Sequence, residues 1–304
     1  MPARLHFPRL HLIEKPTAMA KLTLATCQFQ VENTPQQNLR TISRQMRIAR
    51  QRGAHLAHFS EACLSGYLGA ELKSLRKVDW ALVHNALERV QELAATLRLW
   101  VVIGCNHRLS SPHKPHNSLY VIDDRGQLVT RYDKLFCTGK NTRDGDLRYY
   151  SPGQEFITFQ VRNVCCGLLI CHDFRYPELF REYKRQGVEL MLVSFHCAGM
   201  TRQGFEHYQY SVPATIQAAA ASNYYAVSVT NGTRRYAFPS MVVDTEGKLI
   251  ARAPAHRNTV LVNRIDTRRR LYDASADWRD RCMNGTYHSG QCVDDARSRA
   301  RTEF

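Results

Sequence analysis

The chain has 304 residues, of which 44% are hydrophobic and 23% charged, and its 42 basic against 27 acidic residues give a formal net charge of +15. This composition excludes a disordered protein and predicts one large globular core. No apolar run approaches the roughly 20 residues needed to cross a bilayer, which excludes a transmembrane protein.

The positive charge would suit a nucleic-acid-binding protein. The basic residues are, however, spread over predicted helices and the C-terminal tail, and no nucleic-acid-binding motif accompanies them. We interpret them as a solvated basic surface and expect no specific nucleic-acid partner and no membrane partner. Nucleic-acid binding remains an alternative that depends on charge alone.

The first 18 residues lack the continuous apolar region and the small-residue cleavage site of a secretion signal. The ten cysteines form no CxxC pair, which favours reduced thiols over disulfides or a metal site. We therefore predict a disordered leader over 1–18 and a cytoplasmic protein.

Strands and helices alternate along the chain. Apolar runs predict strands over 22–29, 54–59, 100–109, 127–132, 164–170, 190–194 and 225–230. Helical periodicity predicts helices over 35–52, 81–98, 177–186 and 207–222. Turn signals at 123–126 and 244–247 predict hairpins. The pattern alone indicates an α/β protein with mixed sheets.

Three of the predicted strands lead into a reactive side chain. The strand over 54–59 is followed by Glu61, the strand over 127–132 by Lys134, and the strand over 164–170 by Cys171. Strand ends present side chains next to backbone N–H groups that have no ladder partner. A carboxylate, an ammonium and a thiol at three such ends form a complete set for covalent acyl transfer.

Cys171 lies between an apolar strand without polar alternation and a helix that opens at Pro177. A nearby helix N-terminus would favour a thiolate over a thiol. The alternative is a buried structural cysteine, because free cysteines are commonly small core residues.

The segments FSEACLSGY, RYDKLF and GLLICHDFRYPE resemble, in this order, the Glu, Lys and Cys motifs of the carbon–nitrogen hydrolase (nitrilase) superfamily. The resemblance extends over roughly residues 20 to 290 and points to the amidase and N-carbamoyl amidohydrolase branch. It implies a four-layer α-β-β-α sandwich, in which two mixed sheets are flanked by helices, with the hydrolase domain over 19–266. It also implies that no metal or organic cofactor is needed.

The resemblance assigns a role to each member of the set. Cys171 is the nucleophile that forms a thioester, Glu61 is the general base, and Lys134 holds the developing oxyanion together with the backbone N–H of His172. Many relatives carry a further glutamate in the loop before an S-P-G turn, but this loop has none. Asp146 stands at the corresponding position, and Asp144 is the competing candidate.

Further residues at strand ends are candidate pocket walls, with ordinary packing as the alternative for each. These substrate-binding candidates are Arg175, Phe195, His196, Met200 and Asn231. For Arg175 we favour bracing of the loop through Asp173 or Glu178 over direct substrate contact.

We therefore expect a hydrolase of non-peptide carbon–nitrogen bonds in a small molecule, either an amide or an N-carbamoyl compound. A nitrilase is the second enzymatic choice, since Cys171-His172-Asp173 departs from the C-W-E pattern of true nitrilases. An inactive pseudo-hydrolase that binds or regulates is the third, because the loop glutamate is missing. We further expect a homo-oligomer, a dimer or dimer-based assembly, with 267–304 at a subunit interface; this segment could instead wrap its own subunit.

Overall fold

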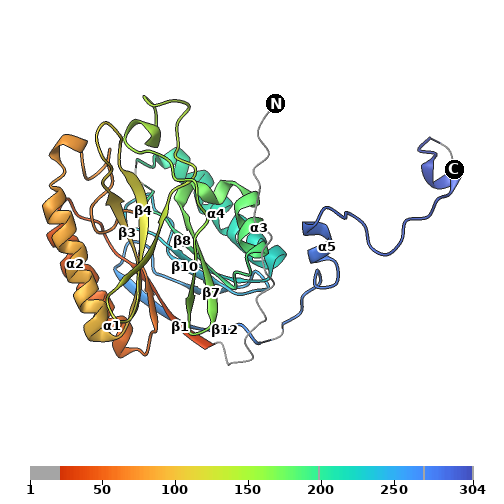
Figure 1. The fold of residues 1–304 in the computed structure, drawn as a ribbon, viewed down its shortest axis with the longest axis horizontal. Helices are drawn as coiled ribbons and strands as arrows, with labels where there is room; N and C mark the ends of the chain where they lie inside the picture. Colours follow the sequence, from red (N-terminus) through yellow and green to blue (C-terminus); the bar gives the residue numbers. More distant parts are fainter. Residues whose placement is uncertain (1–20, 198, 270, 303–304) are drawn as a thin grey trace.

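The computed structural model describes residues 21–197, 199–269 and 271–302, so the predicted leader over 1–18 lies outside the described residues. In this part of the chain two six-stranded sheets pack face to face, and helices cover both outer faces (Figure 1). The predicted α-β-β-α sandwich of two mixed sheets is confirmed.

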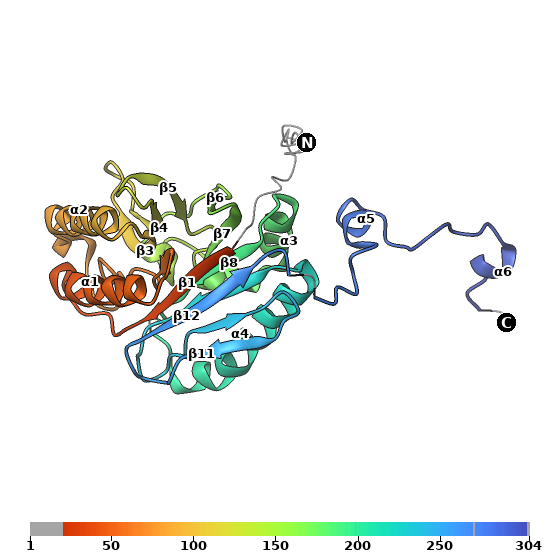
Figure 2. The same cartoon turned by 90° about the horizontal axis from the view of Figure 1, so that it is seen from below.

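The first sheet has the order β12-β1-β2-β3-β4-β5. Its strands are β1 (Lys21–Gln28), β2 (Leu56–His58), β3 (Trp100–His107), β4 (His116–Ile122), β5 (Leu128–Asp133) and β12 (Thr259–Asp266). The helices α1 (Pro35–Gln51) and α2 (Trp80–Leu97) lie on its outer face (Figure 2).

The second sheet has the order β11-β10-β9-β8-β7-β6. Its strands are β6 (Thr158–Val161), β7 (Val164–Ile170), β8 (Leu190–Ser194), β9 (Ala226–Thr230), β10 (Met241–Val243) and β11 (Leu249–Arg252). Its outer face is covered by α3 (Pro177–Arg185) and α4 (Arg202–Asn223). The short helices are η1 (Leu75–Lys77), η2 (Asp146–Arg148), η3 (Cys171–Arg175), α5 (Arg279–Met283) and α6 (Ala296–Arg299).

The two sheets repeat one topology. From β12 to β5, successive pairs are antiparallel, parallel, parallel, antiparallel and antiparallel. From β6 to β11 the same series recurs. The two predicted turns occupy equivalent places, where Gly126 and Gly247 have φ of +80° and +81° and each packs against the second helix of its half.

Most element boundaries lie within two residues of those predicted, and α4 is the largest exception. It begins at Arg202, five residues earlier than expected, because the Thr201 side chain caps it by accepting a hydrogen bond from Gly204 N at 3.1 Å. Strand β2 is shorter than predicted, since the chain turns away after His58 toward Glu61.

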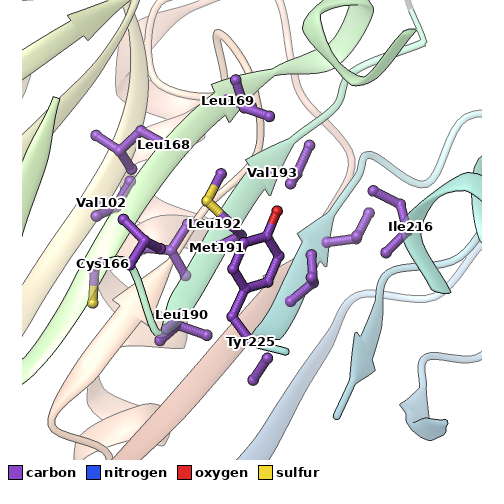
Figure 3. Close-up of a cluster of buried hydrophobic side chains, with 14 of the residues drawn as sticks. Val102, Cys166, Leu168, Leu169, Leu190, Met191, Leu192, Val193, Ile216 and Tyr225 are labelled. Atoms are coloured by element: carbon purple, nitrogen blue, oxygen red, sulfur yellow. The ribbon is translucent and has the colours of Figure 1, made fainter. Parts of the chain in front are cut away.

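Buried strands supply apolar side chains to both of their faces. In β1, Leu22 and Leu24 belong to the core between the sheets, whereas Ala25 and Cys27 pack in the core under α1 and α2. Figure 3 shows the corresponding arrangement in the second half, where Val102 of β3 and Ile216 of α4 lie on opposite sides of the core strands. This explains why these strands lack polar alternation.

The described residues include no helix that is both long and apolar enough to span a bilayer. All ten cysteines lie in the described part of the chain, and each is a free thiol.

A line of polar side chains joins the two sheets inside the sandwich. His58 of β2 forms hydrogen bonds with Ser228 Oγ and Ser194 Oγ, both at 2.9 Å, and Ser228 also bonds Thr26 of β1 at 2.8 Å. All four residues are fully buried, and burial lowers the pKa of His58 to about 3. The imidazole is therefore neutral, and its two nitrogens hold both sheets in register.

Because this pKa is lower in the folded chain than the usual 6.5, the contribution of His58 to stability is complete above pH 6.5 and is lost as the pH falls toward 3. We expect His58→Gln to destabilise the protein at pH 7, and the difference from wild type to shrink by about 2 kcal/mol at pH 5. Urea unfolding at both pH values tests this, with the exposed His113→Gln as the control. A difference that stays constant with pH would contradict it.

Candidate active site

Glu61 is placed by a turn of the chain at the end of β2. Its backbone N–H donates to the carbonyl oxygen of Phe195, just after β8, at 3.3 Å, which ties the turn to the second sheet. The next residue, Ala62, has a positive φ of +50°. The turn thus directs the carboxylate into the space between the sheets, where Glu61 is 1% exposed.

Gly104 makes this turn possible and was not recognised in the sequence. A Cβ atom there would lie 2.2 Å from the carbonyl oxygen of Ser60 and 2.4 Å from the backbone nitrogen of Ala62. Only glycine lets the β3 backbone approach so closely. The sequence offered one indication of this close approach, because Gly104 lies inside the predicted strand 100–109.

The two carboxylate oxygens of Glu61 differ. Oε1 accepts hydrogen bonds from Asn117 Nδ2 at 2.7 Å and from Lys134 Nζ at 3.0 Å. Oε2 is buried and has no hydrogen-bond partner among the described residues. One oxygen therefore fixes the carboxylate, and the other remains available as an acceptor.

Lys134 follows β5 and is held by its backbone N–H, which donates to Asn117 O at 2.9 Å. Its side chain is 1% exposed and lies between Glu61 and Asp146, with Asp146 Oδ2 at 2.8 Å. Burial alone would lower the pKa of Lys134, but Glu61, Tyr67 and Asp146 hold the pKa well above its usual range. Lys134 is therefore a permanent cation at neutral pH.

Asp146 is the residue that the structure brings to Lys134. Its carboxylate also accepts hydrogen bonds from the Tyr67 hydroxyl and from Thr138 N, the latter at 3.2 Å. Although burial opposes ionisation, Lys134 and these donors lower its pKa. Asp144, the competing candidate, is exposed in the same loop. Tyr67 stands in the FSEACLSGY segment, but its partner could not be read from the sequence.

Cys171 is the first residue of η3, directly after β7, and its φ is +45°. It is partly exposed, and Glu61, Lys134, Cys197 and Asp146 all lie close enough to act on its ionisation. Burial and the Glu61 charge raise its pKa well above the usual value, against the opposing effect of Lys134. The resting site therefore favours the thiol, whereas the helix that follows in the sequence would favour a thiolate.

Asp173 holds this turn, although the sequence indicated it only as a possible partner of Arg175. It is fully buried and accepts hydrogen bonds from Tyr132 OH at 2.7 Å, Phe136 N at 2.8 Å and Ile170 N at 2.9 Å. Burial raises its pKa to about 6. These bonds join the loop after Lys134 to the loop of Cys171, so one carboxyl group fixes the relative position of both.

The side chains of His172 and Arg175 both lie against aromatic rings. The His172 ring faces Tyr176, whose hydroxyl lies 3.4 Å from Nε2. Arg175 is exposed, and its guanidinium lies over the rings of Phe174 and Tyr208, at 4.9 and 4.7 Å from their centroids. Arg175 thus braces the outer loop by stacking instead of pairing with Asp173.

The remaining candidates surround Cys197. Phe195 is buried against Phe174 and Phe238. Asn231 donates to Cys197 Sγ at 3.3 Å and to Phe238 O at 2.9 Å.

His196 is fully buried, and its ring stacks on Tyr67 with centroids 5.5 Å apart. Burial lowers its pKa to about 4, so the ring is neutral, and Nε2 lies 3.0 Å from Glu71 Oε2. His196 therefore supports the ring of Tyr67, whose hydroxyl donates a hydrogen bond to Asp146.

Met200 lines a cavity of about 460 Å³ that is not lined by Glu61, Lys134 or Cys171. Its other lining residues are Gln30, Cys197, Gly199, Arg234, Arg235 and Tyr236. The cavity lies close to the three candidate catalytic residues, because its lining residue Cys197 is near both Cys171 and Glu61.

Comparison with known proteins agrees with this architecture. The family described as carbon-nitrogen hydrolase matches residues 23–272. A deaminated glutathione amidase from Bos taurus is 26% identical over 262 residues, which are 81% of this chain and 77% of the bovine protein. A deaminated glutathione amidase from Yersinia enterocolitica is 27% identical over 180 residues, 55% of this chain and 61% of that protein, so the chain spans less than two thirds of this relative.

Solved structures share the fold. A mutant of the Nesterenkonia AN1 amidase from the nitrilase superfamily superposes with a TM-score of 0.72 at 20% identity, covering 86% of this chain and 93% of that one. Another structure of that amidase, with a TM-score of 0.71 at 21% identity, covers 88% and 98% of the two chains and carries the acetamide moiety of fluoroacetamide covalently at the active site cysteine. Since the family match extends over most of the chain, the protein belongs to the carbon–nitrogen hydrolase (nitrilase) superfamily.

Proposed function

We propose that the protein is an amidase-type carbon–nitrogen hydrolase that cleaves an amide or N-carbamoyl bond of a small molecule through a thioester on Cys171. The observation that carries the proposal is the difference between the two carboxylate oxygens of Glu61. Oε1 accepts hydrogen bonds from Asn117 and Lys134, whereas the buried Oε2 has no hydrogen-bond partner among the described residues. A neutral thiol beside an unpartnered carboxylate oxygen is the arrangement that general-base activation requires.

In the first step Cys171 Sγ attacks the carbonyl carbon while its proton moves to Glu61 Oε2. The carbonyl electron pair moves to oxygen, and the resulting oxyanion is stabilised by Lys134 and the backbone N–H of His172. The oxyanion then re-forms the carbonyl, the carbon–nitrogen bond breaks, and Glu61 returns the proton to the leaving nitrogen. A thioester and an amine, or ammonia, result.

Hydrolysis of the thioester repeats the sequence with water. Glu61 takes a proton from the water as its oxygen attacks, and Lys134 again faces the oxyanion. The carbon–sulfur bond breaks, and the leaving sulfur recovers the proton from Glu61. The products are a carboxylic acid and the free thiol, so the site returns to its starting state without a cofactor.

The shorter loop carboxylate argues for catalysis over a pseudo-hydrolase. Asp146 lacks one methylene of the expected glutamate, yet it reaches Lys134 Nζ at 2.8 Å and is itself fixed by Tyr67 and Thr138. The names of the relatives, which are amidases, favour amides over nitriles.

The direct test removes the nucleophile. Cys171→Ala should lower amide turnover by about a thousandfold or more, because no covalent route remains. Cys282→Ser and Cys292→Ser remove the two exposed thiols, and the difference in fluoroacetamide labelling with and without Cys171, read by intact mass, then reports the nucleophile. Equal labelling or turnover with and without Cys171 would refute the mechanism.

A second test compares two neighbouring aspartates. Asp146→Asn removes the charge that holds Lys134, and we expect kcat to fall by about 10- to 100-fold through misplacement of the ammonium. Asp146→Glu should retain more activity. The exposed Asp144→Asn is the matched control, and an equal loss in both asparagine variants would remove Asp146 from the site.

We also propose that the C-terminal segment contributes to a homo-oligomer. Residues 271–283 are bound to their own subunit, since Tyr224 OH donates to Leu271 O at 3.0 Å and Arg279 Nε to Ser222 O at 3.1 Å. Beyond α5 the chain runs away from the sandwich (Figures 1 and 2). Tyr287 and Val293 in this segment are exposed. Such a segment fits a neighbouring subunit better than its own.

Light scattering tests this proposal on three chains: full length, one ending at Met283 and one ending at Asp266. We expect both shortened chains to form smaller assemblies than the full-length protein. The chain ending at Met283 keeps the contacts within its own subunit, so its loss of assembly would not reflect unfolding. An unchanged assembly size in both would contradict the role of the tail.

A further inference from the structure

Asp146 reaches Lys134 although its side chain is one methylene shorter than the glutamate that many relatives carry. Its two carboxylate oxygens have different partners. Oδ1 accepts a hydrogen bond from the Tyr67 hydroxyl, whereas Oδ2 accepts from Lys134 Nζ at 2.8 Å and from Thr138 N at 3.2 Å. The position of the Tyr67 hydroxyl therefore determines the direction in which Asp146 presents its other oxygen to Lys134.

Tyr67 is held in one orientation by the groups around it. Leu72 N donates to Tyr67 O at 3.0 Å, which closes the turn that carries the ring. The ring stacks on His196 with centroids 5.5 Å apart, and it meets the Tyr150 ring edge-on, also at 5.5 Å. A ring that is packed on two sides keeps its hydroxyl in place, so the geometry at Asp146 depends on residues that do not contact it.

Glu71 joins these supports through a buried carboxylate whose side chain is 1% exposed. Oε2 accepts a hydrogen bond from Tyr67 N at 3.0 Å and lies 3.0 Å from His196 Nε2. The Arg234 guanidinium donates to Oε1. Because an ionised carboxylate can only accept, the proton of the neutral His196 ring resides on Nε2, and Glu71 fixes both the backbone of Tyr67 and the ring that stacks on it.

We propose that Glu71 and His196 are positioning residues, which fix Tyr67 so that the shorter Asp146 can hold Lys134 in place. Neither acts on the reacting atoms directly. A glutamate at position 146 would gain one methylene of reach toward the ammonium and would depend less on the orientation that Tyr67 imposes. This inference rests on the proposed function for the role of Lys134.

Turnover of p-nitrophenyl acetate measures the effect, with the burst of nitrophenol giving the concentration of active sites and the steady rate giving kcat. We expect Glu71→Gln and His196→Ala each to lower kcat per active site about tenfold. Glutamine has one acceptor oxygen, and its NH2 group would face a donor of His196 or Arg234. Since Lys134 faces the oxyanion in both acylation and deacylation, both rates should fall together and KM should change less than about twofold.

Glu189→Gln is the matched control. Glu189 also accepts a hydrogen bond from a backbone N–H, that of Cys165 at 3.3 Å, but it lies just before β8, at the end of the strand opposite His196. This variant should retain the wild-type kcat per active site even where it lowers stability. The comparison separates a loss of catalytic geometry from a general loss of folded protein.

A double-mutant cycle tests the compensation itself. In an Asp146→Glu background, Glu71→Gln and His196→Ala should each lower kcat only about twofold, because the longer carboxylate needs less support. Tyr67→Phe removes the hydroxyl and keeps the ring, so it provides the same test if Glu71→Gln does not fold. It should lower kcat about tenfold with aspartate at position 146 and about twofold with glutamate.

Wild-type kcat in Tyr67→Phe, or equal losses with aspartate and with glutamate at position 146, would overturn the proposal. An Asp146→Glu protein without turnover would also contradict it, since the compensation requires that the longer side chain is accepted. Failure of the proposed function has a different signature, because wild-type protein would then show neither turnover nor acylation of Cys171, and the inference would fall with it.

Discussion

The site depends on one buried cation held between two carboxylates. Lys134 can remain charged at 1% exposure only because Glu61 and Asp146 both contact its ammonium group. The same contacts fix Glu61 through one oxygen and leave the other free. Burial first, and then the net negative charge of two carboxylates and one ammonium, keep Cys171 protonated until Glu61 takes its proton during attack on a substrate.

This balance explains why nucleophile and base must act together. A resting thiolate would add a second net negative charge to a buried space, and desolvation would penalise it further. Transfer of the thiol proton to Glu61 leaves the net charge of the group unchanged when the carbonyl oxygen takes the negative charge beside Lys134. The sandwich supplies the required rigidity, since the polar line through His58 and the Asp173 hydrogen bonds fix the strand ends that carry the three groups.

The sequence predicted what depends on local pattern. Glu61, Lys134 and Cys171 each follow an apolar strand, and their motifs are contiguous, so their positions at strand ends could be read directly. Asn117 could not be identified, because its importance depends on which strands are neighbours and in which register they pair. Strand β11 (LIAR) has only four residues and is mostly exposed, so it is too short for a strand pattern to be recognised. The full lining of the cavity at Met200 could not be predicted, because this cavity forms only where segments after β1, β8 and β9 meet.

The most direct test of the central claim is detection of the covalent intermediate itself. Wild-type protein mixed with a p-nitrophenyl ester of a short carboxylic acid, quenched within milliseconds and digested, should carry the acyl group on the peptide that contains Cys171, with a burst of nitrophenol equal to the adduct. Product formed without an adduct on that peptide, or an acyl group on another cysteine, would contradict the account.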